Sequence, residues 1–175
     1  MLSSGNLLGY YQLIFFKYEK SPEYWLTDVS GIPFGMMSEM LQDGGNPYRG
    51  MLYGMTAREP MESVPSQLWK VWDAFGIKDS RMMGYWVSYN PVKTGRNDIL
   101  ATSFVKDGKV MIAIASWAKK DSDIKLQIDW EKLGIDADKA RLTAPDIKGF
   151  QEGFSLSPKD KIKVPKDKGF IFILE

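Results

Sequence analysis

Residues 99–117, ILATSFVKDGKVMIAIASW, decide the fold of the second half of the chain. Residues 99–106 and 110–117 are rich in β-branched and apolar side chains, and Asp107-Gly108 stands between them. Asp-Gly between two such runs is a strong hairpin signal, because a type I′ turn needs positive φ at both central positions. The stretch therefore predicts an antiparallel β-hairpin.

Short β-type segments continue after this hairpin. Residues 124–128 alternate apolar and polar side chains, as a half-buried strand does. Residues 129–134 predict a single helical turn that begins at Asp129 and ends at Gly134. Further strands are predicted at residues 140–143, 161–164 and 170–174, separated by glycines and prolines. This spacing indicates a small antiparallel β-sandwich.

The first half mixes helices and strands. Residues 65–75 place Leu68, Trp72 and Phe75 on one stripe and predict an amphipathic helix that ends at Gly76. A shorter helix is predicted at residues 36–42, and strands at residues 10–16, 51–55 and 82–87. This alternation is typical of parallel α/β structure, but a closed barrel needs eight such units in roughly 250 residues. The predicted fold class is α+β, with an incomplete α/β barrel-like N-terminal segment followed by an antiparallel β-sandwich.

Composition also changes near the middle of the chain. All eight Tyr and nine of the ten Met lie before residue 90. Basic and acidic residues number 7 and 9 in residues 1–90, against 16 and 13 in residues 91–175, so the net charges are −2 and +3. We therefore expect a domain boundary near residue 90, with the partial barrel in residues 1–90 and the sandwich in residues 91–175.

Composition restricts the chemistry and the partners as well. The net charge of +1 favours neither nucleic acid nor an acidic membrane as a partner. The apolar run at residues 10–16 is far too short to span a bilayer, and the first residues lack the basic cluster of a cleavable signal. The chain has no Cys and no His, which excludes thiol nucleophiles, imidazole bases and the metal sites that use either ligand. We expect no cofactor and no bound metal.

Four polar residues in Gly-rich or Pro-rich connections are candidates for substrate binding. They are Asp28, Arg49, Tyr53 and Arg58. Loops that follow strands hold the sites of α/β enzymes, and carboxylates with Tyr and Arg nearby are the residue set that binds sugars. The alternative is structural: Asp28 caps a turn, Arg49 forms a local ion pair with Asp43 or Glu39, and the aromatic side chains fill the core.

Two tryptophans in the second half, Trp117 and Trp130, could likewise either bind a sugar or pack in the core. A flat exposed indole can stack on a sugar ring, but large aromatic residues in a small β-domain usually fill its core, and core is the interpretation we favour. The lysines at positions 159, 161, 163, 166 and 168 interleave with Asp160 and Asp167. This pattern indicates a solvated strand edge and not a phosphate-binding track.

Several blocks of the chain resemble a large bacterial family of glycoside-hydrolase-like proteins. The blocks are PEYWLTDVSGIPFGMM at residues 22–37, GGNPYRGM at 44–51, WKVWDAFGI at 69–77, MGYW at 83–86, ASWA at 115–118 and IDW at 128–130. The resemblance covers about residues 16–175. It implies the last part of a catalytic (β/α)₈ barrel followed by a β-sandwich, and a periplasmic or secreted protein.

The resemblance also implies a difference at the N-terminus. The family pattern carries a strand-end acidic residue flanked by glycines just before the block at residues 16–25, where this chain has YQLIF at residues 11–15. Glycoside hydrolysis ordinarily needs two carboxyl groups held roughly 5 to 10 Å apart. No such pair is recognisable here, so the catalytic residues are unknown and we expect the chain alone not to hydrolyse glycosides.

Two functions follow from these observations. The first is the C-terminal region of a glycoside hydrolase, in which the sandwich braces the barrel and loops near Asp28, Tyr53 and Arg58 border a carbohydrate cleft. The second is a free-standing, non-catalytic β-sandwich module that binds carbohydrate or another protein. An exposed coplanar aromatic pair that includes Trp117 or Trp130 favours the module, whereas burial of both favours the brace. An incomplete barrel surface also predicts self-association.

Overall fold

The computed structural model describes residues 21–24, 46–54 and 65–175. The predicted elements at residues 10–16 and 36–42, together with Asp28 and Arg58, lie outside these ranges. Within them, no helix is both long enough and apolar enough to cross a membrane.

The described elements are short helices and ten strands. The helices are α2 (Pro22–Tyr24), α3 (Pro47–Met51), α4 (Pro65–Phe75), the 3₁₀ helix η3 (Ile77–Asp79) and α5 (Trp130–Leu133). The strands are β1 (Arg81–Met83), β2 (Val92–Lys93), β3 (Ile99–Lys106), β4 (Lys109–Ser116), β5 (Ser122–Ile124), β6 (Gln127–Ile128), β7 (Leu142–Ala144), β8 (Phe154–Leu156), β9 (Ile162–Val164) and β10 (Gly169–Leu174).

The predicted hairpin is confirmed. Strands β3 and β4 pair antiparallel from Ile99 opposite Ser116 to Lys106 opposite Lys109, around Asp107-Gly108. Gly108 has a φ of 71°, but Asp167 is the one non-glycine residue with positive φ in the described ranges, so Asp107 does not have the positive φ of a type I′ turn. The expected turn type was therefore wrong: a single glycine at the second central position supplies the conformation that this turn needs.

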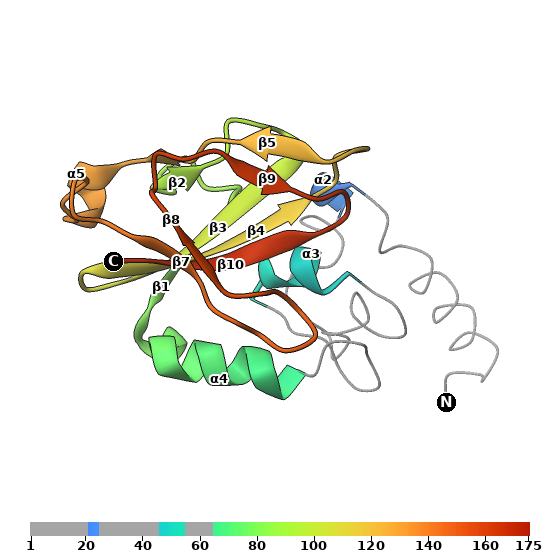
Figure 1. Ribbon diagram of the computed structural model, residues 1–175. Helices are drawn as coiled ribbons and strands as arrows, with labels where there is room; N and C mark the ends of the chain where they lie inside the picture. The colour runs from blue at the N-terminus through green and yellow to red at the C-terminus, as the bar shows by residue number, and fades with distance from the viewer. Residues whose placement is uncertain (1–20, 25–45, 55–64) are drawn as a thin grey trace, which may run out of the picture.

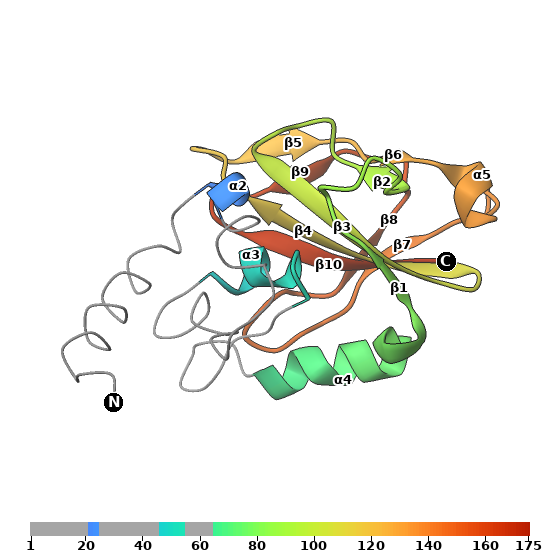
Figure 2. The same ribbon diagram turned by 180° about the vertical axis from the view of Figure 1, so that it is seen from behind.

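A six-stranded antiparallel sheet forms around the hairpin, in the order β1-β3-β4-β10-β7-β8. Two further pairs, β2 with β6 and β5 with β9, form separate two-stranded sheets. Figure 1 shows these small sheets on one side of the large sheet and helices α3 and α4 on the other side. The opposite view in Figure 2 shows the same three layers.

The two faces of the large sheet carry two separate hydrophobic clusters. In β4, Ile112 and Ile114 point into the cluster shared with the small sheets, while Ala113 and Ala115 belong to the cluster shared with α3 and α4. Strand β4 is consequently buried at every position from Val110 to Ser116. The predicted α+β class with an antiparallel sandwich is confirmed, and the helical layer on the second face explains why β4 is apolar on both faces from Val110 to Ala115.

Helix α4 matches its prediction in both bounds and orientation. It begins at Pro65 and ends at Phe75, and Gly76 follows with a φ of 79°. Leu68 and Phe75 are buried in the cluster on the helical side of the sheet, whereas Trp69 is 50% exposed. The stripe predicted from helical periodicity is thus the face that covers the sheet.

The strand predicted at residues 51–55 was wrong, because this stretch begins as the end of helix α3. The side chain of Asn46 accepts a hydrogen bond from the Arg49 amide and caps the helix, and Pro47 occupies its first turn. A turn through residues 52–54 follows, with Gly54 at a φ of 72°. The apolar run from Met51 to Tyr53 suits a strand by composition, but the cap upstream fixes a helical turn.

Two other strands are shorter than predicted. The strand expected at residues 82–87 ends at Met83, because turns closed by the Val87 and Asn90 amides follow it. The strand expected at residues 124–128 divides into β5 and β6, which pair with β9 and β2 in different small sheets. Its predicted alternation still holds, since Ile124 and Leu126 are buried and the lysine between them is exposed.

The helical turn predicted at residues 129–134 is confirmed. The Asp129 carboxylate accepts the Lys132 amide at 3.1 Å, and Gly134 ends the turn with a φ of 64°. Strands β2 and β8 were not predicted, because each has only two or three residues and no alternating run marks it.

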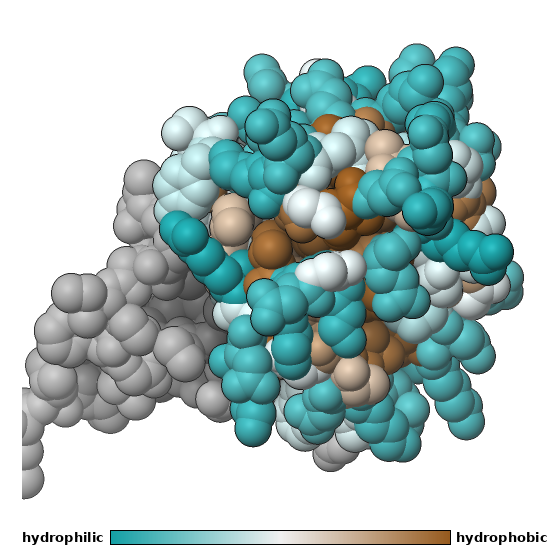
Figure 3. Space-filling view, turned by 90° about the vertical axis from the view of Figure 1, so that its left-hand side faces the viewer, coloured by the Kyte–Doolittle hydropathy of each residue, from teal (hydrophilic) through white to brown (hydrophobic). Residues whose placement is uncertain are grey.

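Large apolar side chains remain exposed in several places. In the described ranges they are Trp69, Met82, Trp86, Tyr89 and Phe154. Figure 3 looks onto the side where α5 and the C-terminus lie and shows apolar atoms in a band between polar side chains. Self-association through an incomplete barrel surface stays a prediction.

Close packing of β10 on β4 provides a test of this sheet. A Cβ atom on Gly169 would lie 2.8 Å from the carbonyl carbon of Ile114 and 3.0 Å from the Ala115 Cα, both of them backbone atoms that cannot move aside. We expect Gly169→Ala to lower the free energy of unfolding by about 3 kcal/mol or more. Gly108→Asn is the control and should lose about 1 kcal/mol or less, because nothing lies within 4 Å and Asn tolerates positive φ. Equal losses in urea unfolding would contradict this account of the sheet.

Candidate functional site

Of the four predicted substrate-binding residues, the structure describes Arg49 and Tyr53. Arg49 lies within α3 and Tyr53 in the turn that follows it, four residues apart, and their side chains contact different segments of the chain. Arg49 contacts the end of β4 and the turn before β10, while Tyr53 contacts the segment after β1. Asp28 and Arg58 lie outside the described residues, so their roles stay predictions.

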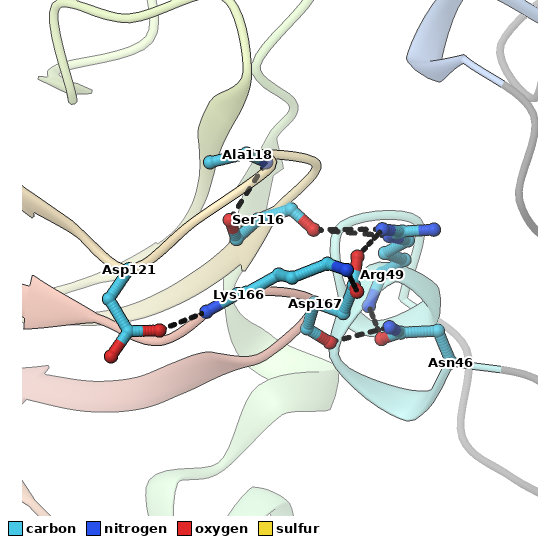
Figure 4. Close-up of polar contacts among 7 residues, drawn as sticks. All are labelled: Asn46, Arg49, Ser116, Ala118, Asp121, Lys166 and Asp167. Carbon is cyan, nitrogen blue, oxygen red and sulfur yellow. Dashed lines mark hydrogen bonds and ion pairs between the residues drawn. The ribbon is translucent and has the colours of Figure 1, made fainter.

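The Arg49 side chain is held deep in the structure, at 5% exposure. Its Nε and Nη2 atoms donate to the carbonyl oxygen of Ser116 at 3.2 and 3.1 Å, and Nη2 also donates to Asp167 Oδ1 at 2.7 Å. The guanidinium carbon lies 4.7 Å from the ring centre of Trp117. Figure 4 shows the guanidinium group between the Ser116 carbonyl and the Asp167 carboxylate. The guanidinium charge is therefore paired within the fold and is shielded from solvent.

Neighbouring polar groups fix the Asp167 turn in place. Asn46 Nδ2 donates to the Asp167 carbonyl at 2.6 Å, and Lys166 Nζ lies 3.7 Å from the Asp167 carboxylate. The Lys166 amide donates to Asp121 at 3.0 Å, and this hydrogen bond lowers the pKa of the Asp121 carboxyl (Figure 4). The ion-pair partner that the structure describes for Arg49 is therefore 118 positions away in the sequence, and the local partners considered above, Glu39 and Asp43, lie outside the described residues.

Tyr53 lies in an aromatic cluster with Tyr85 and Trp86. Its ring stacks on Trp86 with a centroid distance of 5.7 Å and an angle of 12°, and meets Tyr85 edge-on at 6.0 Å. The two hydroxyls are 2.9 Å apart, and the Pro22 carbonyl oxygen lies 3.0 Å from Tyr85 and 3.3 Å from Tyr53. The three oxygen atoms can form two hydrogen bonds, in which the Tyr53 hydroxyl donates to Tyr85 and the Tyr85 hydroxyl donates to the Pro22 carbonyl. Each phenol must keep its proton to do this, so both are neutral.

A pocket of about 500 Å³ adjoins this cluster between α2 and the β2–β3 loop. It is lined by Glu23, Tyr85, Asn90, Val92, Lys93, Thr94, Gly95, Arg96, Asn97, Leu100, Ala101 and Gln127. The carboxylate, amide and cationic groups among these supply hydrogen-bond donors and acceptors around a small apolar floor, as in sites for small polar molecules.

Part of this polar lining is already used by the fold. Asn90 is buried; it donates to the Ala101 carbonyl at 2.9 Å and accepts from Ser103 Oγ at 2.7 Å. Arg96 and Asp98 form an exposed two-bond ion pair, both bonds 2.8 Å long, which lowers the pKa of Asp98. A general acid in glycoside hydrolysis needs a raised pKa, so Asp98 does not fit that role.

Sequence reasoning did not identify this pocket. The signal that could have found it is the polar run KTGRND at residues 93–98, which joins two strands across a glycine with a φ of 71°. The described residues contain no group of three acidic side chains that could hold a metal ion.

Neither tryptophan of the sandwich forms an exposed platform. Trp117 is half-buried beneath Arg49 and packs on the cluster of the helical face. Trp130 is half-buried against the cluster under the small sheets. Both therefore contribute to the core, as favoured from the sequence.

The buried phenols lead to a spectroscopic test. Burial raises the pKa of Tyr48 and Tyr85, and burial together with the hydrogen bond to Tyr85 raises that of Tyr53. Because the folded state holds these protons more tightly, their stabilising effect is complete below pH 10 and is lost as the pH rises further. We expect at most five of the eight tyrosines to ionise near pH 10 in an ultraviolet titration of the folded chain. Eight normal titrations while circular dichroism still shows native structure would contradict the cluster.

Two family models match the chain. Residues 10–60 match the glycoside hydrolase 123 TIM-barrel domain, and residues 64–175 match the glycoside hydrolase 123 C-terminal domain. The barrel match spans far fewer residues than the roughly 250 of a closed barrel, so it covers part of one. None of the curated proteins compared matches the chain. The domain division expected at residue 90 stays a prediction. Because the C-terminal match extends over well over half of its length, the chain belongs to the glycoside hydrolase 123 family.

Proposed function

We propose that residues 64–175 brace the barrel part of a glycoside hydrolase, and that the pocket beside Tyr85 borders its carbohydrate cleft. The observation that carries the proposal is the anchoring of α3. This helix lies within the stretch that matches the barrel domain, and its Arg49 donates to Ser116 and Asp167 in the stretch that matches the C-terminal domain.

Further contacts support the brace on both sides of Arg49. Tyr48 donates its hydroxyl to the Phe150 carbonyl at 2.8 Å, and Thr102 Oγ1 donates to the Leu52 carbonyl at 2.8 Å. Met51 and Leu52 are fully buried in the cluster that contains Ala113 and Ala115 of β4. Small side chains on this face of β4 let the helix approach the sheet closely, which is how a rigid interface between two elements forms.

The pocket supports the second part of the proposal. Its lining joins Glu23, from the stretch that matches the barrel domain, with the β2–β3 loop of the C-terminal domain. Binding sites favour such boundaries between domains, and carboxylate and amide groups beside an aromatic ring suit sugar hydroxyls. Asp28, Tyr53 and Arg58 remain the proposed substrate-binding residues; of these the structure describes Tyr53, which contacts Tyr85 in the pocket lining. For Arg49 the anchoring contacts support the structural role.

A catalytic role for this chain alone has less support. Hydrolysis needs two carboxyl groups held across the sugar by a rigid scaffold, and residues 10–60 can supply only part of a barrel. A free-standing module is also less favoured, because Trp117 and Trp130 are both half-buried in the core clusters.

Substitution of Arg49 tests the brace. Arg49→Ala leaves the Ser116 carbonyl unpaired and a gap over Trp117, so we expect the free energy of unfolding to fall by about 2–3 kcal/mol. Amide hydrogen exchange should rise at residues 50–54 while the β3–β4 pairing stays protected. Asp167→Asn is the matched control; its carboxylate is half exposed and Asn tolerates its positive φ, so the loss should stay below about 1 kcal/mol.

Exchange in the unaltered chain gives the decisive comparison. If residues 50–54 exchange as fast as an unfolded peptide while β4 is protected, α3 is not docked and the brace is wrong. The brace is supported if residues 50–54 and β4 both exchange slowly in the unaltered chain, and if Arg49→Ala speeds exchange at residues 50–54 but not in β4.

A further inference from the structure

A second pocket, of about 590 Å³, adjoins the start of β10 and the loop at residues 145–153. It is lined by Tyr48, Asp146, Ile147, Lys148, Gly149, Phe150, Gln151, Glu152, Phe154, Pro165, Lys168, Gly169 and Phe170. None of these residues lines the pocket beside Tyr85, which adjoins β2 and β3. In the sheet, β4 separates β3 from β10, so the two pockets lie by different strands.

Aromatic rings in fixed orientations form part of its wall. Phe154 meets Phe170 at 5.5 Å and 88° and Phe172 at 5.7 Å and 85°, so two neighbours hold its ring nearly perpendicular to theirs. Tyr48 and Phe150 pack at 4.5 Å on the other wall. Phe172 is fully buried, whereas Phe154 keeps 36% of its surface exposed. A rigid, partly exposed ring in a pocket offers apolar contact at little entropic cost.

The side chain of Gln151 makes the pocket floor rigid. Its Nε2 donates to the Ile171 carbonyl at 3.0 Å and to the Pro145 carbonyl at 2.8 Å, and its Oε1 accepts the Ile171 amide at 2.8 Å. The amide thus pairs with β10 as a neighbouring strand would, and it fixes the loop at residues 145–153 against the sheet. This loop carries the pocket's charged residues.

Four charged residues stand around these rings: Asp146 and Glu152, Lys148 and Lys168. All four are exposed, and none forms an ion pair with another residue in the described part of the chain. Two positive and two negative groups give no net charge, which disfavours anionic and cationic ligands alike. They do supply acceptors and donors for several hydroxyl groups.

We propose that this pocket binds a neutral saccharide. A pyranose presents an apolar face of C–H groups that matches the exposed part of Phe154, and hydroxyls around its edge that match the carboxylates and ammonium groups. The volume lies within the range of small-ligand pockets. The site is distinct from the pocket proposed to border the cleft, and all of its lining except Tyr48 comes from residues 146–170 of the C-terminal domain. It places a carbohydrate-binding surface on the C-terminal domain itself.

The competing occupant is an extended peptide. Among the described strands, β8 pairs with β7 alone and forms an edge of the large sheet, and a peptide can add to such an edge through backbone hydrogen bonds. Backbone pairing does not use the carboxylates of Asp146 and Glu152, so side-chain substitutions separate the two occupants.

The test is titration of the full chain with lactose and with cellobiose, followed by amide chemical shifts in NMR. We expect saturable shifts at residues 146–152 and 168–170 with a Kd on the order of 1 mM. Phe154→Ala should raise that Kd by about tenfold or more. Glu152→Gln keeps the shape of an exposed side chain and should weaken binding severalfold without loss of folding.

Tyr89→Ala is the control, since it removes an exposed aromatic ring that lines neither pocket and should leave the Kd unchanged. The proposal is overturned if neither disaccharide shifts these amides at concentrations up to about 50 mM, well above the expected Kd. It is also overturned if Glu152→Gln and Phe154→Ala bind as the unaltered chain does, or if the shifts map only to residues 90–101. Failure of the Arg49 experiment would remove only the Tyr48 contribution to this pocket, so binding that depends on Glu152 and Phe154 is tested separately from the brace.

Discussion

The docking of α3 onto strand β4 is the contact on which the arrangement of the described residues depends. Strand β4 is buried on both faces, so it needs a second covering layer besides the small sheets. Alanines at positions 113 and 115 leave room for a helix there, and the buried Met51 and Leu52 fill it. Arg49 then secures the end of the same helix to the end of the same strand. Packing and polar contacts thus reinforce one interface.

Both pockets follow from this docking. Tyr48, at the start of α3, contributes to the wall of the pocket near β8, and Tyr53, just after α3, holds Tyr85 at the wall of the pocket near β2. One short helix therefore positions an aromatic side chain toward each of two sites by different strands of the sheet. Movement of α3 would alter both pockets, which ties the barrel part of this glycoside hydrolase 123 family member to surfaces of its C-terminal domain.

Local signals predicted the parts of the fold that local contacts determine. The β3–β4 hairpin, helix α4 and the capped turn at α5 each carry their turn or cap residues within a few positions, and each is present. The strand predicted at residues 51–55 was wrong because the apolar run was weighed above the cap at Asn46, which makes Met51 the last residue of α3 and is followed by a turn. The contact of Arg49 with Asp167 spans 118 positions, and no local pattern encodes such a pairing. The walls of both pockets also come from distant segments, and only the polar run at residues 93–98 of the first pocket carries a local signal.

The chemistry of Arg49 explains why this contact favours one arrangement. A guanidinium group stays charged at any pH at which the protein is folded, so it cannot be buried as a neutral side chain. Burial is tolerable where the Ser116 carbonyl and an acceptor oxygen on the side chain at position 167 are both in place. Those groups lie at the end of β4 and in the turn before β10, so α3 docks only onto a formed sheet. An ion pair of this kind adds little net stability, but a misplaced helix would leave the Arg49 charge buried without its partners, which costs free energy. The proposed brace between two domains requires this preference for one arrangement.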